Sequence, residues 1–310
     1  MTEEFEIVIA GAGIAGLTAA MTASRLGRKT LLLMGNVPGG LLLSINRIDG
    51  YPGFPEGVPG YDLCPMAQEQ AVAAGAVLAS GELTAIAAQD GNYQLTTTDI
   101  QYLARTVIIA TGASLKKLGV PGEEKYQGKG VSHCASCDAP VLRNRAVVVV
   151  GGGDSALQEA LTLAEFAANV IILQRNASLT AQAAYQQQVL AQPAIKIRYN
   201  TVVEEILGDA AVMGVRIKDI TTGATSMLDV AAVFAYIGLQ ANSDLLHGQL
   251  TLDENGRIPV DALLRTERRG ILAAGIVRSG AAGRAVSSAG DGAIAAISAD
   301  HYLIDQSWRE

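Results

Sequence analysis

The chain contains two short runs of apolar residues. Each run is followed by a glycine-rich turn and then by a segment that predicts a helix. The first run covers residues 7–10 and the second residues 146–150, and the turns that follow are residues 11–16 and 151–156. Apolar runs without polar alternation are typical of parallel strands covered on both faces. The repeat therefore predicts an α/β fold with two doubly wound, Rossmann-like domains.

The second copy is expected to be inserted in the first. Two apolar runs that end in tight turns, residues 107–112 and 233–238, bracket it. We expect an outer dinucleotide-binding domain of residues 1–113 and 245–310 and an inserted domain of residues 114–244. The outer domain is predicted to end in a helix from 287 to 302, interrupted near Gly290 and Gly292.

Composition narrows the range of partners and compartments. The chain has 310 residues, 17% of them charged, and a net charge of 23 − 30 = −7. An acidic balance argues against nucleic acid or an anionic membrane as a partner. The acidic N-terminus lacks the pattern of a signal peptide, and no apolar stretch approaches the ~18 residues of a membrane span. We expect a cytoplasmic protein.

Cys134 and Cys137 form a CxxC motif that Asp138 follows directly. Two cysteines at this spacing can close a small disulfide ring, and in the cytoplasm such a pair is typically catalytic or metal-binding. A zinc site would need further ligands at paired spacing. Since Cys64 and the three histidines are scattered singly, we predict a redox dithiol, no metal, and a buried apolar role for Cys64.

The two glycine-rich turns predict phosphate binding. Glycines let the backbone approach a pyrophosphate at a helix N-terminus, where unpaired N–H groups favour anions. The residues expected to form these turns are Gly11, Gly13 and Gly16 in the first copy and Gly151, Gly153 and Ala156 in the second.

Together these motifs resemble those of the low-molecular-weight thioredoxin reductases over nearly the whole chain. The matching segments are GAGIAG at 11–16, PGG at 38–40, YPGFPEG at 51–57, ATGAS at 110–114, PGE at 121–123, GKGVSHCASCD at 128–138, VVVVGGGDSA at 147–156, FAYIGLQ at 234–240 and GILAAG at 270–275.

This resemblance implies an outer domain that binds FAD and an inserted domain that normally holds NADPH. It also implies a homodimer, a rotation between the domains, and a thioredoxin-like disulfide protein as substrate. Within the motif, it implies that Cys137 faces the flavin, that Cys134 attacks the substrate disulfide, and that Asp138 exchanges protons with the departing thiolate.

The resemblance also identifies residues expected to contact the flavin. Beyond the first turn, they are Ala15, Met34, Gly39, Gly40, Leu41, Tyr51, Thr111, Gly112, Gly275, Ile276, Arg284 and Ala285. Tyr51 lies in a loop rich in proline and glycine, where it serves either as an aromatic beside the flavin or in loop packing. Trp308, near the C-terminus, either stacks on the flavin or makes a surface or dimer contact.

The inserted domain departs from the family pattern where NADPH would be selected. The family usually carries a His-Arg-Arg cluster and a further arginine that hold the 2′-phosphate. Here the corresponding residues are Gln174, Arg175, Asn176 and Thr180. No acidic residue stands there to select NAD either. We therefore expect NADPH not to be the reductant.

The flavin site departs from the pattern as well. Apolar or small residues stand where the family has polar ones, at Leu41, Gly50, Ile276 and Ala285. These changes resemble a branch of the family that does not depend on pyridine nucleotides and draws electrons from ferredoxin or from a second FAD. A second FAD could use the turn at residues 151–156 or stack on the first.

The hypothesis is a flavin-dependent disulfide oxidoreductase with an electron source other than NADPH. Two alternatives remain open at this point. One is an NAD(P)H-dependent thioredoxin reductase with a weakened nucleotide site, and the other is a redox-sensing flavoprotein without turnover. The CxxC followed by Asp138 argues against the second alternative.

Overall fold

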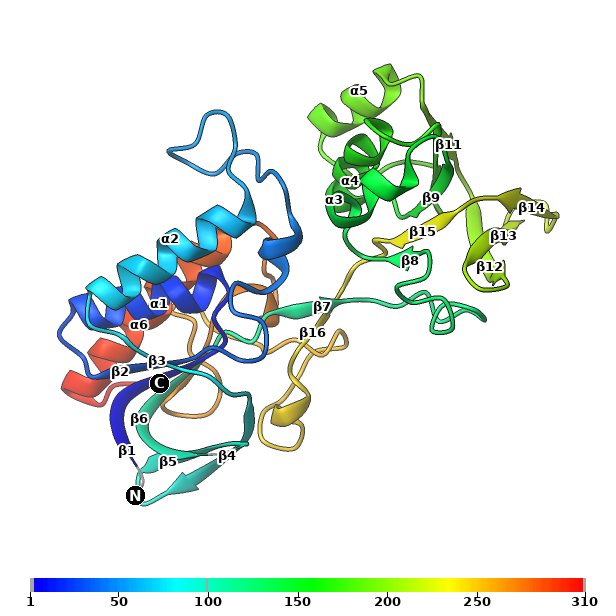
Figure 1. Ribbon diagram of the computed structural model, residues 1–310. Helices are drawn as coiled ribbons and strands as arrows, with labels where there is room; N and C mark the ends of the chain where they lie inside the picture. The colour runs from blue at the N-terminus through cyan, green and yellow to red at the C-terminus, as the bar shows by residue number, and fades with distance from the viewer. Residues whose placement is uncertain (1–2, 99, 309–310) are drawn as a thin grey trace. The chain divides into compact units, whose positions relative to one another are not determined.

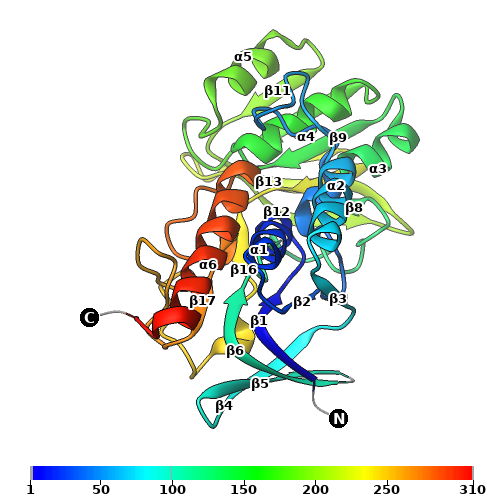
Figure 2. The same cartoon turned by 90° about the vertical axis from the view of Figure 1, so that its left-hand side faces the viewer.

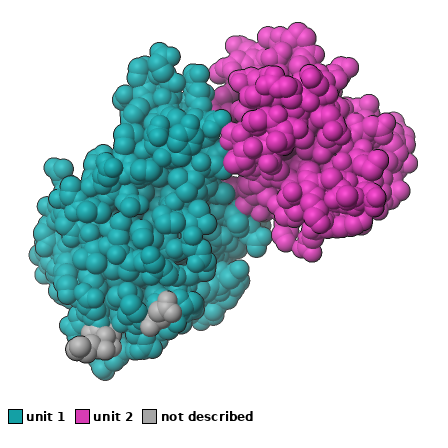
Figure 3. Space-filling model, in the orientation of Figure 1, with its two compact units in different colours: residues 1–114, 240–310 teal, residues 115–239 magenta. Residues whose placement is uncertain are grey.

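Two units, each built on its own sheet, make up the structure, a computed structural model that describes residues 3–98 and 100–308 (Figure 1). The first unit holds residues 1–114 and 240–310, and the second holds residues 115–239 (Figure 3). Residues 1–2, 99 and 309–310 of the expected outer domain lie outside the described residues. No helix in the described part of the chain is long and apolar enough to cross a membrane.

The first unit is built on a seven-stranded sheet with the order β3-β2-β1-β6-β5-β4, in which β17 also pairs with β6. Strands β1, β2, β3, β6 and β17 pair in parallel, and β4 and β5 form an antiparallel extension. Their bounds are β1 Glu3–Ala10, β2 Thr30–Leu33, β3 Val77–Ala79, β4 Leu83–Gln89, β5 Asn92–Thr97, β6 Gln101–Ile109 and β17 Ile271–Ala273.

Helices α1 (Ile14–Arg25), α2 (Gly60–Ala73) and α6 (Ala285–Asp305) cover one face of this sheet (Figures 1 and 2). The other face packs against apolar side chains of residues 245–260, not against a helix. Three short 3-10 helices complete the unit: η1 Gly40–Ser44, η3 Asp244–Leu246 and η4 Gly275–Val277. The Rossmann-type α/β fold is confirmed.

The closing helix α6 is continuous, so the interruption expected near its two glycines is wrong. A Cβ on Gly292 would lie 2.1 Å from the Ala15 carbonyl oxygen, whereas a Cβ on Gly290 would meet nothing within 4 Å. Gly292 is therefore required by the close approach of α6 to α1, which lie side by side in Figure 2. Packing between the helices stabilises α6 against the low helix propensity of glycine.

The second unit has a five-stranded parallel sheet with the order β11-β10-β9-β15-β8. Its strands are β8 Val131–Ser132, β9 Ala146–Val150, β10 Asn169–Leu173, β11 Ile195–Arg198 and β15 Ala232–Ala235. Helices cover one face and an antiparallel sheet covers the other. The covering elements are α3 Ala135–Asp138, η2 Ala139–Leu142, α4 Asp154–Ala164, α5 Ala183–Ala191, β12 Thr201–Gly208, β13 Val212–Asp219 and β14 Thr225–Asp229.

The chain passes between the two units along β7 (Ala113–Leu115) and β16 (Leu239–Ala241), which pair with each other. Residue 114 and residues 240–244, expected in the inserted domain, belong to the first unit instead. The physical reason is that Asn242 donates its side-chain amide to the Thr111 carbonyl at 3.0 Å, which holds the returning chain to the first unit.

Candidate functional site

The turn between β1 and α1 has the geometry of a phosphate cradle. Gly11 has a φ of +107°, and a Cβ on it would lie 2.4 Å from the Ala110 carbonyl oxygen. Gly13 is the N-cap of α1, makes no side-chain cap, and leaves open space where a Cβ would point. Because the first backbone N–H groups of a helix lack partners within the helix, this opening fits the pyrophosphate of FAD.

Two glycines that we expect to contact the flavin lie at the start of η1 and pack against this turn. The Gly39 N–H donates to the Ala12 carbonyl at 2.8 Å, and a Cβ on Gly40 would lie 3.8 Å from the Gly13 Cα. The Cys64 thiol donates to the Gly39 carbonyl at 3.5 Å. Burial raises the pKa of this thiol to about 11, so Cys64 packs as an apolar residue and stays uncharged.

A second group of predicted residues meets at the ends of β6 and β17. The Thr111 hydroxyl donates to the Asn242 carbonyl at 2.6 Å, and the Gly112 carbonyl accepts the Asn242 N–H at 3.0 Å. The Ile276 side chain lies 3.8 Å from the position of a Cβ on Gly112. Sequence reasoning did not identify Asn242, although its hydrogen bonds with Thr111 and Gly112 hold the backbone after β6.

Asp291 of α6 is the second residue that sequence reasoning missed. Its buried carboxylate accepts the Gly275 N–H at 3.0 Å and two bonds from the Arg278 guanidinium at 2.7 and 2.9 Å. The acidic residue in the SAGDG segment was the available signal. Asp291 holds the backbone turn at Gly275 in place. Ile276 is the next residue on this turn, and its own side chain provides no polar group.

The other predicted flavin contacts of the first unit are spread over separate elements. Leu41 lies in η1, Ala285 begins α6 and Arg284 is the N-cap of α6. The Met34 N–H extends the β2–β3 pairing by donating to the Ala79 carbonyl at 2.9 Å. A Cβ on Gly275 would lie 2.9 Å from the Ala15 Cβ and one on Gly16 would lie 1.8 Å from the Gly11 carbonyl oxygen, so these turns pack tightly.

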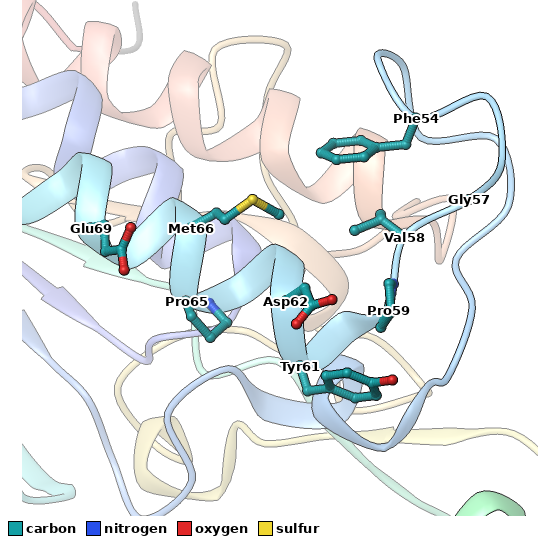
Figure 4. Close-up of a pocket in the computed structure, with 9 residues that line it drawn as sticks. All are labelled: Phe54, Gly57, Val58, Pro59, Tyr61, Asp62, Pro65, Met66 and Glu69. Atoms are coloured by element: carbon teal, nitrogen blue, oxygen red, sulfur yellow. The ribbon is translucent and has the colours of Figure 1, made fainter.

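Tyr51 packs in its own loop. Its ring lies 6.0 Å from that of Phe54, within a small apolar cluster that includes Ile14 and Leu63. Beside it, Phe54, Val58, Tyr61 and Met66 contribute to a cavity of about 460 Å³ (Figure 4). None of the predicted cofactor residues lines this cavity, which is therefore separate from the glycine cradle.

Trp308 packs against the body of the first unit. Its ring lies 5.0 Å from the Tyr302 ring in an edge-to-face arrangement, and its indole N–H donates to the Thr266 carbonyl at 3.2 Å. The Arg265 guanidinium also lies over the Trp308 ring. The structure thus gives Trp308 packing contacts within the first unit.

The CxxC motif lies at the start of α3 in the second unit, and Cys134 and Cys137 are joined by a disulfide. Cys134 is the N-cap, and its sulfur accepts the Cys137 N–H at 3.3 Å and lies 3.4 Å from the Ser136 hydroxyl. Hydrogen-bond donors around a sulfur favour its thiolate. Asp138, the last residue of α3, is half-buried beside the pair, as a proton carrier would need to be.

The second glycine turn is partly filled by the chain itself. A Cβ on Gly152 would lie 2.6 Å from the buried Gln174 side chain, whose amide donates to the Ser178 carbonyl at 2.8 Å. The Thr180 N–H donates to the Gly152 carbonyl, and the Gln182 N–H donates to the Asp154 carboxylate at 2.7 Å. Uncharged groups thus occupy most of the segment where the family places arginines.

The remaining predicted residues of this turn are arranged as in a dinucleotide cradle. Gly151 has a φ of +133° and approaches the Tyr236 carbonyl, and Gly153 is the uncapped N-cap of α4, with Ala156 fully buried behind it. Two exposed arginines follow adjacent strand ends, since Arg175 follows β10 and Arg198 ends β11. These two arginines therefore stand at the edge of the sheet where β10 and β11 end.

No group of three or more histidine, cysteine, aspartate or glutamate side chains that could hold a metal lies together within residues 3–98 and 100–308. The structure describes one dinucleotide turn in the first unit, and a second dinucleotide turn and the Cys134–Cys137 pair in the second unit. The fold and these groups define an α/β disulfide oxidoreductase of the dinucleotide-binding class.

Comparison with known proteins gives the family. Residues 5–292 match the family described as pyridine nucleotide-disulphide oxidoreductase. The chain is 39% identical over 303 residues to a thioredoxin reductase of Treponema pallidum, covering 98% of both chains. The structure of Lactococcus lactis thioredoxin reductase superposes with a TM-score of 0.94 at 36% identity, covering 97% of this chain and 99% of that one.

Two further relatives have names that state different electron donors. An Arabidopsis thaliana protein named NADPH-dependent thioredoxin reductase 3 is 36% identical, over 96% of this chain and 58% of its own length. The structure of a ferredoxin-flavin thioredoxin reductase from Clostridium acetobutylicum is 28% identical, with a TM-score of 0.54, covering 98% of this chain and 99% of that one.

The chain belongs to the pyridine nucleotide-disulphide oxidoreductases and, within them, to the thioredoxin reductase family. It is a flavin-dependent disulfide oxidoreductase of the thioredoxin reductase type.

Proposed function

We propose that the protein reduces a thioredoxin-like disulfide protein with electrons from a source other than NADPH. The observation that carries this proposal is the segment at residues 174–182, where Gln174 fills the space beside Gly152 and no arginine stands at positions 176 and 180. Each missing charge-assisted contact to a 2′-phosphate is typically worth about 1.5–3 kcal/mol. Ferredoxin or a second flavin are the donors we propose.

The residues of the two units supply the rest of the reaction. The first glycine turn and the residues around Gly275 would hold FAD, which supplies two electrons when it is bound and reduced. Reduction of the Cys134–Cys137 disulfide consumes these electrons and one proton and leaves a thiol and a thiolate. Asp138 would hold or release that proton beside the pair.

The exchange with the substrate disulfide then uses the Cys134 and Cys137 sulfurs in turn. The Cys134 thiolate attacks one sulfur of the substrate disulfide, and the other substrate sulfur leaves as a thiolate that takes a proton. The Cys137 thiol next gives up its proton, attacks Cys134, restores the Cys134–Cys137 disulfide and releases the second substrate sulfur as a thiolate, which takes up that proton. The substrate gains two electrons and two protons over the cycle.

A second candidate is the NADPH-dependent reaction. Arg175 and Arg198, which stand at the ends of adjacent strands, would together supply positive charge for a 2′-phosphate. The name of the Arabidopsis relative favours this candidate at the level of the family.

Rapid mixing of the FAD-loaded protein with NADPH distinguishes the two candidates. We expect flavin absorbance to remain through many seconds at sub-millimolar NADPH, while dithionite-reduced protein reduces a thioredoxin-like substrate. Bleaching of the flavin within seconds would support the NADPH-dependent reaction instead. Reduced protein that fails to reduce any such substrate would exclude both.

A further inference from the structure

A buried carboxyl and a buried phenol lie directly behind the CxxC helix in the second unit. Glu159 is on the inward face of α4, with 8% of its surface exposed, among alanine and leucine side chains. Tyr236 follows β15 and is 9% exposed. Neither residue has a part in nucleotide binding or in the disulfide exchange as described above.

These two groups meet at the first residue of α3. The Glu159 carboxyl lies beside the Ala135 N–H and the Tyr236 hydroxyl. Ala135 is fully buried and stands next to Cys134, the N-cap. Within the described part of the chain, the Tyr236 hydroxyl makes no hydrogen bond of good geometry although it lies beside the Glu159 carboxyl, and the Nδ1 atom of His133 makes none either. A buried polar group left unpaired is costly and calls for a functional reason.

Burial raises the pKa of Glu159 to about 7, and the Ala135 N–H and the Tyr236 hydroxyl offset only part of this effect. Burial, followed by the charge of Glu159, raises the pKa of Tyr236, and Asp138 adds to this rise. Tyr185 of α5 shares one apolar cluster with Tyr236. The carboxyl of Glu159 therefore changes charge near neutral pH.

We propose that Glu159, which lies beside the Tyr236 hydroxyl and the Ala135 N–H, is a positioning residue that takes up a proton when the Cys134–Cys137 disulfide is reduced. A carboxylate beside the Ala135 N–H stands next to Cys134, the residue whose thiolate forms on reduction. Two negative charges this close repel each other, so formation of the thiolate favours protonation of Glu159.

The step balances as follows in atoms and electrons. The disulfide, the Glu159 carboxylate, two electrons and two protons give one thiol, one thiolate and the Glu159 carboxylic acid. The reductant is the flavin in the proposed function and dithiothreitol in the test below. The inference rests on the proposed function only in that the Cys134–Cys137 pair is the redox couple.

Equilibration of the full-length protein with mixtures of reduced and oxidised dithiothreitol tests the inference without the flavin reaction. The reduced fraction is measured at several pH values between 6 and 8.5 by acid quenching, alkylation and mass spectrometry. We expect Glu159→Gln to raise the equilibrium constant for reduction by about fivefold at pH 8.5 and to leave it nearly unchanged at pH 6.

Matched variants separate this role from a structural one. Glu165→Gln removes an exposed carboxyl at the end of the same helix and should match the wild type at every pH. Glu159→Asp keeps a titrating carboxyl and should keep a pH-dependent profile. The equilibrium constant for reduction should fall as Glu159 loses its proton with rising pH. Tyr236→Phe removes a hydroxyl that favours the carboxylate, so this fall should begin about half a pH unit higher.

The outcomes discriminate between the two proposals. If the wild-type pair is reduced but Glu159→Gln shows the same profile as the wild type, the role of Glu159 is wrong and the proposed function stands. If dithiothreitol cannot reduce the pair at any ratio, both are wrong. If Glu159→Gln does not fold, the Tyr236→Phe profile decides, because an unshifted profile contradicts the inference.

Discussion

Cys134 and Cys137 differ in their surroundings although they share one short helix. The Cys134 sulfur accepts the Cys137 backbone N–H and lies near the Ser136 hydroxyl. These donors stabilise negative charge on Cys134 when the disulfide opens. The asymmetry agrees with the expectation that Cys134 is the sulfur that attacks the substrate.

We predict that Cys134 in the Cys137→Ser variant reacts with iodoacetamide at lower pH than Cys137 in the Cys134→Ser variant. The difference should reach about one pH unit because the donors around Cys134 remain in place. The measurement is the rate of alkylation against pH, with buried Cys64 as an internal control that does not react in the folded protein. Equal profiles would contradict this assignment of the sulfurs.

The raised pKa of Glu159 predicts a pH dependence of stability. Its value is about 7 in the folded chain and 4.5 ordinarily, so between these values the folded chain binds a proton that the unfolded chain has released. The free energy of unfolding should therefore fall as pH rises through this window and stay lower above it. The size of the effect is about 2–3 kcal/mol.

The Glu159→Gln variant, which cannot titrate, should escape this loss. We expect it to match the wild type near pH 4.5 and to be more stable near pH 8, in urea unfolding followed by circular dichroism. Glu165→Gln should follow the wild type throughout. A constant difference between Glu159→Gln and the wild type across the window would show that the carboxyl is not the cause.

At the scale of elements, helix α6 shows that packing requires glycine at one position and leaves another position free to carry a side chain. Gly292 faces the backbone of α1, whereas Gly290 faces open space on the same helix. We predict that Gly292→Ala destabilises the protein by about 2 kcal/mol or more, because α1 and α6 must separate. Gly290→Ala should stabilise it by up to about 1 kcal/mol, since alanine favours a helix.

Thermal unfolding of the two variants at one pH provides the measurement. The two substitutions lie two residues apart in the same helix, so each is the control for the other. A similar effect from both would mean that the approach of α6 to Ala15 is looser than the structure gives.

The segment between β10 and α5 is the element on which the proposed electron donor rests. We predict that Asn176→Arg with Thr180→Arg lowers the NADPH concentration needed for flavin reduction at least tenfold, because two charge-assisted contacts become available. The matched control is Asn176→Gln with Thr180→Ser, which adds no charge. If the arginine variant reduces no faster than the control, the missing charges do not support the proposed donor.

At the scale of the whole molecule, the two glycine turns pose the question of how many flavins bind. The first turn is open at Gly13, while the second has the Gln174 side chain over Gly152. The partly filled second turn favours one FAD per chain, held by the first unit. We predict a ratio near one after acid release of the flavin, unchanged by added FAD, whereas a ratio near two would support the form with a second FAD.

Much of this protein was determined by the sequence alone. The two strand–turn–helix repeats predicted the Rossmann-type fold, since buried parallel strands and glycine turns depend on local pattern. The spacing of Cys134 and Cys137 predicted their disulfide for the same reason. The family followed from the ordered motifs, and the roles of Cys134, Asp138 and the flavin contacts remain predictions.

Only the tertiary structure decided the rest. It brought Asn242 to Thr111 and Asp291 to the Gly275 turn, across long stretches of sequence. It made α6 continuous, because contact with α1 outweighs the low helix propensity of its glycines. It also placed Glu159 behind Cys134, where burial gives an ordinary surface-type residue an altered pKa. Such effects depend on which distant groups share a buried space, and a linear pattern does not contain that information.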